Sequence, residues 1–306
     1  MSLALPAAQP TRSQFSAPPG VLLDSVDGGR TTRVIAADTG NHRLLVWSDL
    51  PACDGADSAV VVGQKDPTSE GPRAGGRGPE RGLHLPTGLA RLDDLLLVAD
   101  GWNHRVLAFD AALDRDDPAP TAVLGQRTCG EVEPNAGRAV HGSTFFWPFG
   151  LLVHDGWLWV ADTGNRRVLS WQSDVLPDGP ADVVLGQRDF GTAFEQPHVA
   201  QGGGRMRFPY ALVGVGEGLA VADTANNRVL SWPQVPHPGP DGVMPAASVV
   251  LGQDDLDAAG ENRWTAVTPD SLCWLYALAA APDQRYGEVL AVADSGNNRF
   301  VLWSRA

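Results

Sequence analysis

Lysine is almost missing from this chain. Lys65 is the only lysine, and the 36 acidic residues bring the net charge to −13. Such a surface repels phosphate backbones, which argues against a nucleic-acid partner. No run of 18 or more apolar residues exists, so neither a membrane span nor a membrane partner is expected. The first 30 residues lack the basic start and apolar core of a signal peptide, so we expect a cytoplasmic protein, with secretion left open.

Cysteine is also scarce. Cys53, Cys129 and Cys273 are odd in number, widely spaced and without a C-x-x-C pair, so they predict no disulfide framework. Helical periodicity is missing over any useful length, whereas 35 glycines and 24 prolines suit a chain with many turns. These absences point to an all-β protein from a reducing compartment.

One short phrase is repeated five times. It reads ADTGNHR, ADGWNHR, ADTGNRR, ADTANNR and ADSGNNR, and its aspartates are spaced by 62, 62, 61 and 71 residues. Apolar runs such as LLLVA and VLSW flank the phrase, which is typical of a hairpin closed by an Asp/Gly/Asn turn. A third run ends in Gly-Gln in four of the five units, and a fourth run opens each unit. A fixed period of this kind predicts a repeat architecture.

Four short strands per unit predict a β-propeller of five four-stranded antiparallel blades, in a single domain over residues 1–306. Six blades, one of them degenerate, is the alternative. The last unit stops after Trp303 without a Gly-Gln strand, and an apolar stretch, Leu3-Ala4-Leu5, precedes the first unit. We therefore expect the N-terminal stretch to complete the last blade and close the ring.

The repeated phrase resembles the signature of the NHL-repeat family, whose members are β-propellers. The resemblance covers five units and almost the whole chain, although the units are longer than the family's usual 40 to 45 residues. The surplus lies mainly between each Gly-Gln pair and the next inner strand. What the resemblance implies is a propeller fold, and propellers include both binding modules and enzymes.

The polar residues of the phrase are predicted to be structural. Asp and Asn stabilise tight turns, and an arginine can bridge to the aspartate with its planar guanidinium. A catalytic group is needed once rather than five times. The predicted structural set is Asp38, Asn41, Arg43, Asp100, Asn103, Arg105, Asp162, Asn165, Arg167, Asp223, Asn226, Arg228, Asp294, Asn297 and Arg299.

A functional site is more readily expected where the units differ in sequence, which is at the start of each inner strand. The innermost strands of a propeller line its channel, so the residues around these starts should surround one channel mouth. Apolar walls with a few polar groups favour a small-molecule site, although the same aromatics could simply plug the channel. The predicted mouth residues are His84, Trp147, Phe149, Arg207, Tyr210, Trp274 and Tyr276.

Neither a metal nor a cofactor is expected. The histidines show no H-E-x-x-H pattern, and no nucleophile is marked by its context. His84, His141 and His198 lie in successive long insertions and are the weak candidates for a metal site, as zinc ligands converge in some lyase relatives of the fold. Catalytic residues are not assigned.

The sequence thus favours a non-enzymatic binding or scaffolding propeller, whose loop-rich mouth holds a small molecule, a peptide or a protein partner. The alternative is a metal-dependent lyase or hydrolase with its site in the central channel.

Overall fold

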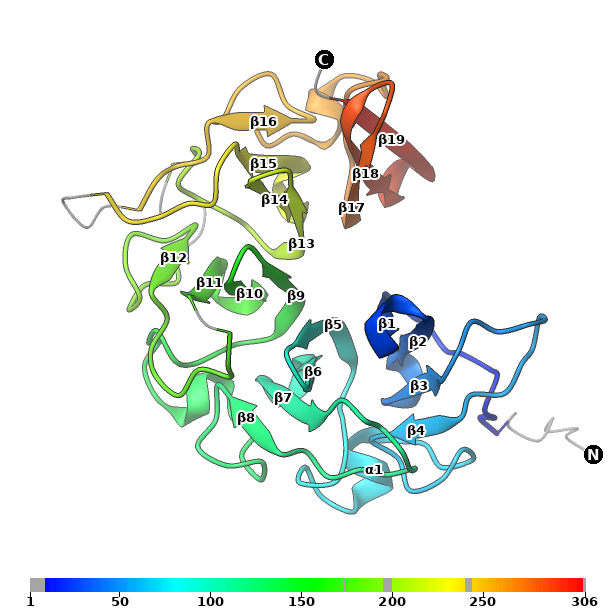
Figure 1. The fold of residues 1–306 in the computed structure, drawn as a ribbon. Coiled ribbons are helices and arrows are strands. Elements are labelled where there is room, and N and C mark those ends of the chain that lie inside the picture. The colour runs from blue at the N-terminus through cyan, green and yellow to red at the C-terminus, as the bar shows by residue number, and fades with distance from the viewer. Residues whose placement is uncertain (1–8, 173, 195–199, 240–243, 305–306) are drawn as a thin grey trace, which may run out of the picture. The chain divides into compact units, whose positions relative to one another are not determined.

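The fold is all-β and is that of a five-bladed β-propeller, as the repeats predict (Figure 1). The computed structural model describes residues 9–172, 174–194, 200–239 and 244–304. Five antiparallel sheets follow one another along the chain, and the six-bladed alternative is wrong, because the described residues form no sixth sheet. Among the described residues, helical structure is restricted to α1 (Pro72–Gly76) and to short 3-10 turns.

Contacts divide the chain into two compact units. The first comprises Met1–Val123 and Arg127–Val132, and the second comprises Leu124–Gln126 and Glu133–Ala306. The first sheet of the first unit contains β1 (Gly20–Val26), β2 (Thr31–Asp38), β3 (Arg43–Trp47) and β4 (Val60–Val62). The next sheet contains β5 (Pro86–Leu92), β6 (Leu95–Asp100), β7 (Arg105–Asp110) and β8 (Ala122–Leu124), and β8 ends where the chain passes into the second unit.

The second unit holds three sheets. They contain β9 (Pro148–His154), β10 (Trp157–Asp162), β11 (Arg167–Gln172) and β12 (Val183–Leu185); β13 (Pro209–Val215), β14 (Gly218–Asp223), β15 (Arg228–Trp232) and β16 (Val249–Leu251); and β17 (Leu275–Asp283), β18 (Gly287–Asp294) and β19 (Arg299–Ser304). The last sheet thus has three strands among the described residues. The predicted fourth strand falls on residues 1–8, which lie outside the described residues, so ring closure stays a prediction.

The repeated phrase forms the hairpin between the second and third strand of every sheet. Its central residues make a 3-10 turn: η2 (Thr39–Asn41), η3 (Gly101–Asn103), η5 (Thr163–Asn165), η6 (Thr224–Asn226) and η8 (Ser295–Asn297). The residue after each turn has a left-handed backbone, and its N–H donates to the carbonyl of the first turn residue. This geometry pairs the phrase's Asp with its Arg across the two strands, as in Asp162 and Arg167.

Three further 3-10 turns lie outside the phrase: η1 (Asp27–Gly29), η4 (Pro134–Gly137) and η7 (Glu261–Trp264). The Gly-Gln pair ends the outer strand at a close approach of two segments. Gly186 has a φ of 86°, and a Cβ there would lie 2.9 Å from Met206. Glycine is required here because it adopts a positive φ without strain and has no Cβ to clash with Met206.

The cores lie between neighbouring sheets within each unit. In the first unit, apolar residues of β2, β3 and β4 pack with those of β6 and β7. In the second unit, one core joins β10, β11 and β12 to β14 and β15, and another joins β14 and β15 to β17, β18 and β19. Pairs of β-branched and aliphatic residues on these strand faces supply the burial that stabilises each unit.

Candidate functional site

A hydrogen-bonded frame fixes the chain just before each inner strand. In the third repeat, Asp162 Oδ2 accepts from Asn165 Nδ2 at 2.8 Å and from Arg167 Nε at 2.7 Å. Asp162 Oδ1 accepts from the backbone N–H of Phe146 at 2.8 Å. The carboxylate therefore ties the hairpin turn to the residue that stands two positions before Pro148.

The same three bonds recur in all five repeats. The aspartates Asp38, Asp100, Asp162, Asp223 and Asp294 accept from the backbone of Ser16, His84, Phe146, Arg207 and Cys273 respectively, and each also binds the Asn and Arg of its own phrase. The phrase thus positions the residues that surround the start of each inner strand.

The ion pair of this frame is deeply buried. Both side chains are 0% exposed in the first four repeats, and only Arg299 of the fifth is 26% exposed. Burial raises the pKa of Asp162 and of Asp223, while the paired arginine, the asparagine amide and the backbone N–H lower it. The guanidinium also donates to loop carbonyls, as Arg167 does to Phe190 and His141. A buried charge held by this many donors is costly to disrupt.

The residue before β5, β9, β13 and β17 takes a left-handed backbone. Leu85, Trp147, Phe208 and Trp274 have φ values of 51°, 54°, 57° and 48°. This conformation is unusual for a bulky residue, and it is held because bonds on both sides fix the backbone. Trp274 N–H, for example, donates to Asn227 Oδ1 at 2.9 Å. The left-handed turn brings the side chains before and after it into one region.

Five aromatic rings in the second unit form a continuous series of contacts, which we name the aromatic cluster. Trp147 contacts Phe149, Phe208 and Tyr210 with ring centroids 6.5, 6.3 and 5.7 Å apart. Phe149 and Tyr210 are 4.4 Å apart, and Tyr210 and Tyr276 are 5.1 Å apart. All five contacts are edge-to-face, the geometry that the ring quadrupoles favour.

The aromatic cluster spans the starts of β9, β13 and β17 and runs from buried to exposed rings. Tyr210 is 8% exposed and Tyr276 is 42% exposed. Burial, with a smaller contribution from Tyr276, raises the pKa of Tyr210 to about 12, so its hydroxyl keeps its proton at neutral pH. Phe208 is absent from the predicted mouth residues, although its place before Pro209 matches that of Trp147 before Pro148.

One arginine contacts the cluster and another precedes one of its rings in the sequence. Arg207 lies directly before Phe208, and its Nε is buried without a hydrogen-bond partner among the described residues. The guanidinium of Arg166 lies 5.5 Å from the ring centre of Phe208, which is the range of a cation–π contact. Trp274, another predicted mouth residue, donates from its indole Nε1 to Glu261 Oε1 at 2.8 Å.

His84, the remaining predicted mouth residue, belongs to the first unit. Its ring lies 5.2 Å from that of His42 and 6.0 Å from that of Trp102. Burial lowers the pKa of His42, His84 and His104, the last to about 4, so these imidazoles are neutral at pH 7. Neutral His42 accepts the backbone N–H of Leu85 at Nδ1. In the first unit, Leu85 and Thr87 stand where the second unit has Trp147 and Phe149, and the imidazoles gather beside them.

The weak metal candidates are not brought together by any described contact. His84 has the neighbours just given, His141 Nδ1 lies 3.2 Å from Ser143 Oγ, and His198 lies outside the described residues. Within the described ranges, no group of three or more His, Cys, Asp or Glu is arranged to hold a metal ion. The metal-dependent alternative stays a prediction, which elemental analysis of protein purified without a metal-affinity step tests.

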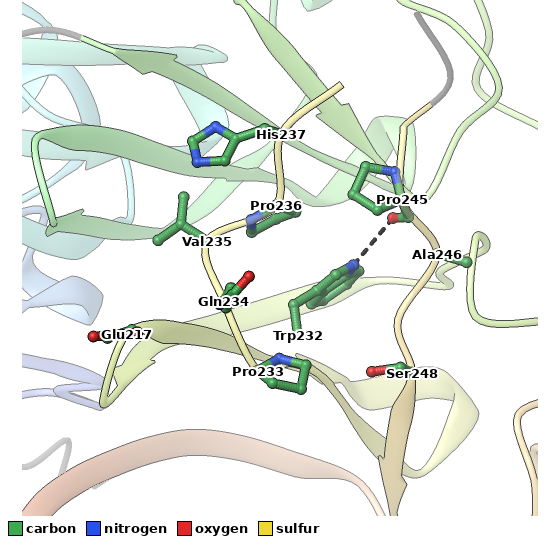
Figure 2. A pocket seen from close by; sticks show the side chains of 10 residues that line it. All are labelled: Glu217, Trp232, Pro233, Gln234, Val235, Pro236, His237, Pro245, Ala246 and Ser248. Atoms are coloured by element: carbon green, nitrogen blue, oxygen red, sulfur yellow. Dashed lines mark hydrogen bonds between the residues drawn. The ribbon is translucent and has the colours of Figure 1, made fainter. Parts of the chain in front are cut away.

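Two pockets lie at the opposite ends of the strands, away from the repeated phrase. Figure 2 shows a pocket of about 650 Å³ around Trp232, whose Nε1 donates to Pro245 O at 3.0 Å. Glu217 of the β13–β14 hairpin and His237 also line it. A pocket of about 500 Å³ in the first unit is lined by Arg33, Arg91 and their neighbours. Sequence reasoning missed both, although the proline-rich segment after Trp232 was a visible signal.

No family model matches the chain, and no curated protein matches it either. A crystal structure of a protein from Lactobacillus plantarum is similar, with a TM-score of 0.50 and 14% identity over 96% of this chain and 69% of that one. The glutaminyl cyclase of Myxococcus xanthus has a TM-score of 0.44 and 12% identity, over 97% of this chain and 94% of that one. A chain of a nidogen/laminin complex has a TM-score of 0.42 and 17% identity over 72% of this chain, and this chain spans 60% of its length.

At these identities the likeness concerns the fold alone. None of the described helices is long and apolar enough to cross a membrane.

Proposed function

We propose that this chain is a non-enzymatic binding β-propeller related to NHL-repeat proteins. Its ligand site is the aromatic cluster together with Arg207, and the ligand is a small molecule, or a group on a peptide or protein, that combines a flat apolar part with an acidic part. The unbroken series of ring contacts from Trp147 to Tyr276 is the observation that carries this proposal.

The rings supply the apolar half of the site. Tyr276 is 42% exposed at one end of the series, so a flat group that packs on it removes apolar surface from water. Edge-to-face contacts hold the rings in fixed orientations before any ligand arrives. A surface that is already ordered loses little conformational entropy on binding.

Arg207 supplies the polar half. A buried guanidinium N–H without a partner is unfavourable, and an acidic ligand group would give it an acceptor. The protein as a whole carries a charge of −13, so a local arginine is needed to attract an anion. These two requirements together select a ligand that is both flat and acidic.

The test uses 1-anilinonaphthalene-8-sulfonate, a flat aromatic anion, in a fluorescence titration of the native protein. Tyr276→Ala should weaken its binding by about twofold to tenfold, since one aromatic contact is worth roughly 0.5–1.5 kcal/mol and 1.4 kcal/mol is tenfold. Arg207→Gln should weaken its binding by about twofold to tenfold as well, because the variant removes the charge that pairs with the sulfonate.

The chain offers a matched control pair. Tyr286 is 50% exposed and has the guanidinium of Arg285 at 4.9 Å from its ring centre, in the hairpin at the far end of β17. Tyr286→Ala and Arg285→Gln should leave the titration unchanged. Equal losses from both pairs, or a wild type without saturable binding, would overturn the proposed site.

A further inference from the structure

The outer strands of the sheets differ in how they are covered. Val60 of β4 is 5% exposed and Val183 of β12 is 0% exposed, whereas the corresponding Val249 of β16 is 40% exposed. The three strands are alike in sequence and register: each pairs antiparallel with the third strand of its sheet over three residues. The difference therefore arises from what lies against them.

A loop of the next sheet covers β4. It follows β7, and its backbone pairs with the outer edge of β4: Asp117 N–H donates to Val61 O at 2.9 Å, and Asp116 Oδ1 accepts from Val61 N–H at 2.8 Å. Leu113 of the same loop is buried in the core with Val60 and Val62. An extended segment with an apolar residue and an acidic acceptor thus completes this edge.

A similar loop covers β12. The segment after β15 places Val235 and Ala247 in one core with Val183 and Leu185 of β12. Val235 N–H donates to Glu217 O at 2.8 Å in the adjacent hairpin, as Ala111 N–H does to Asp94 O at 2.9 Å in the first unit. Two loops of unrelated sequence therefore occupy equivalent places.

At β16 the equivalent place is a groove. Its volume is about 310 Å³, and its walls include Val249 and Leu251 of β16, Leu290 of β18 and Trp303 of β19. Trp303 holds the strand-end position of Phe109 and Trp232, which are 2% and 4% exposed beneath their loops. The groove thus lies over the outer strand of its sheet, where Leu113 and Val235 pack over β4 and β12.

The edge of β16 also has the same pairing register as the edge of β4. Val250 pairs with Leu230 as Val61 pairs with Leu45, so its N–H and C=O point to the open side, as those of Val61 do. Within the described ranges, no backbone group from outside the sheet bonds to Val250. An unpaired edge of this kind is a template for one more extended segment.

We propose that the β16 edge and its groove bind an extended peptide of a partner protein by β-strand addition. The peptide carries a large aliphatic residue for the groove and, three residues later, an Asp or Asn that accepts from Val250 N–H, followed by a backbone N–H that donates to Val250 O. This pattern is that of Leu113, Asp116 and Asp117, which complete β4. The surface is separate from the aromatic cluster and does not depend on its proposed role.

The probe is a synthetic peptide with the sequence of residues 111–119, AALDRDDPA. Calorimetry should give saturable binding to the wild-type protein, and hydrogen exchange should slow at the Val250 amide. Val250→Pro should weaken binding at least tenfold, because it removes the donor N–H while proline is tolerated in an edge strand. A peptide with Leu113→Ser should weaken binding to a similar degree.

Three results would overturn the proposal: absence of saturable binding, equal binding to the Val250→Pro variant, or protection at Val61 instead of Val250, which would mean that the peptide replaces the chain's own loop. Slowed exchange at Val250 that depends on protein concentration without peptide would assign the edge to a second copy of the chain and would also overturn it. Unchanged far-ultraviolet circular dichroism controls for folding of the Val250→Pro variant.

Discussion

The starts of the inner strands in the two units share one backbone frame but carry different side chains. In both units an aspartate of the repeated phrase accepts the backbone N–H two residues before the strand. Around the proline that begins the strand, the first unit has Leu85 and Thr87 where the second has Trp147 and Phe149. The comparison separates two roles: the phrase sets the position of the site, and the variable residues beside it set its chemistry.

Removing the frame should therefore have the largest effect. Asp162→Ala leaves Arg167 buried without its partner and frees the Phe146 N–H, so we expect a loss of about 3–5 kcal/mol in the free energy of unfolding. Urea denaturation followed by tryptophan fluorescence measures it. Asp182→Ala is the control, because Asp182 accepts one backbone N–H at an exposed site. A variant of Asp162 with wild-type stability would show that the frame does not hold the strand start.

A smaller effect should appear within the turn itself. Where the fourth residue of the phrase is glycine, its N–H donates to the carbonyl beside the strand start at 2.8 Å, as Gly164 does to Phe146. Trp102 and Ala225 hold the same position in their repeats, and their bonds lengthen to 3.1 and 3.2 Å. A Cβ on Gly164 would lie 2.5 Å from Phe146 O, which explains the longer bonds where a side chain is present.

Gly164→Ala should accordingly cost roughly 1–3 kcal/mol of stability, the range for an overpacked site. The reciprocal change, Ala225→Gly, should cost less than about 1 kcal/mol, because that turn already accommodates a Cβ and glycine adds only chain entropy. Thermal denaturation of the two variants side by side measures the contrast. Equal losses would mean that the bond lengths do not reflect steric pressure from the side chain.

The same comparison shows what the sequence could predict. The repeated phrase was enough to place the hairpins, the five sheets and the register of the strand starts, because each unit repeats the same local turn chemistry. The register alone put Phe149, Tyr210 and Tyr276 at equivalent positions, and in the structure their rings are in contact.

Features that depend on loop paths could not be predicted. The contact of His84 with His42 joins residues 42 positions apart through a long insertion, and no local pattern encodes that path. Nor did the sequence indicate that β16 is exposed while β4 and β12 are buried, because the three strands read alike and the difference lies in their covering loops. Whether residues 1–8 complete the last sheet is still a prediction; their deletion should lower the melting temperature sharply.

The smallest expected effect is a pH dependence of stability that comes from the histidines of the first unit. The pKa of His104 is about 4 in the folded first unit, lowered by burial first and then by the charges of His84 and Arg73. An unfolded histidine titrates near 6.5, so between about pH 4 and 6.5 the unfolded chain binds more protons and stability rises with pH. His42 and His84 act in the same direction.

His104→Asn should therefore reduce the gain in unfolding free energy between pH 4.5 and 8 by less than about 1 kcal/mol. The effect is small because solvent screens a half-buried group. Asparagine suits the left-handed backbone of that position, as Asn227 and Asn298 hold it in other repeats. Melting temperatures from pH 4.5 to 8 at constant ionic strength measure the slope, with the pH 8 value as the internal reference. A variant that loses stability equally at every pH would show that His104 acts through packing and not through the titration of its imidazole.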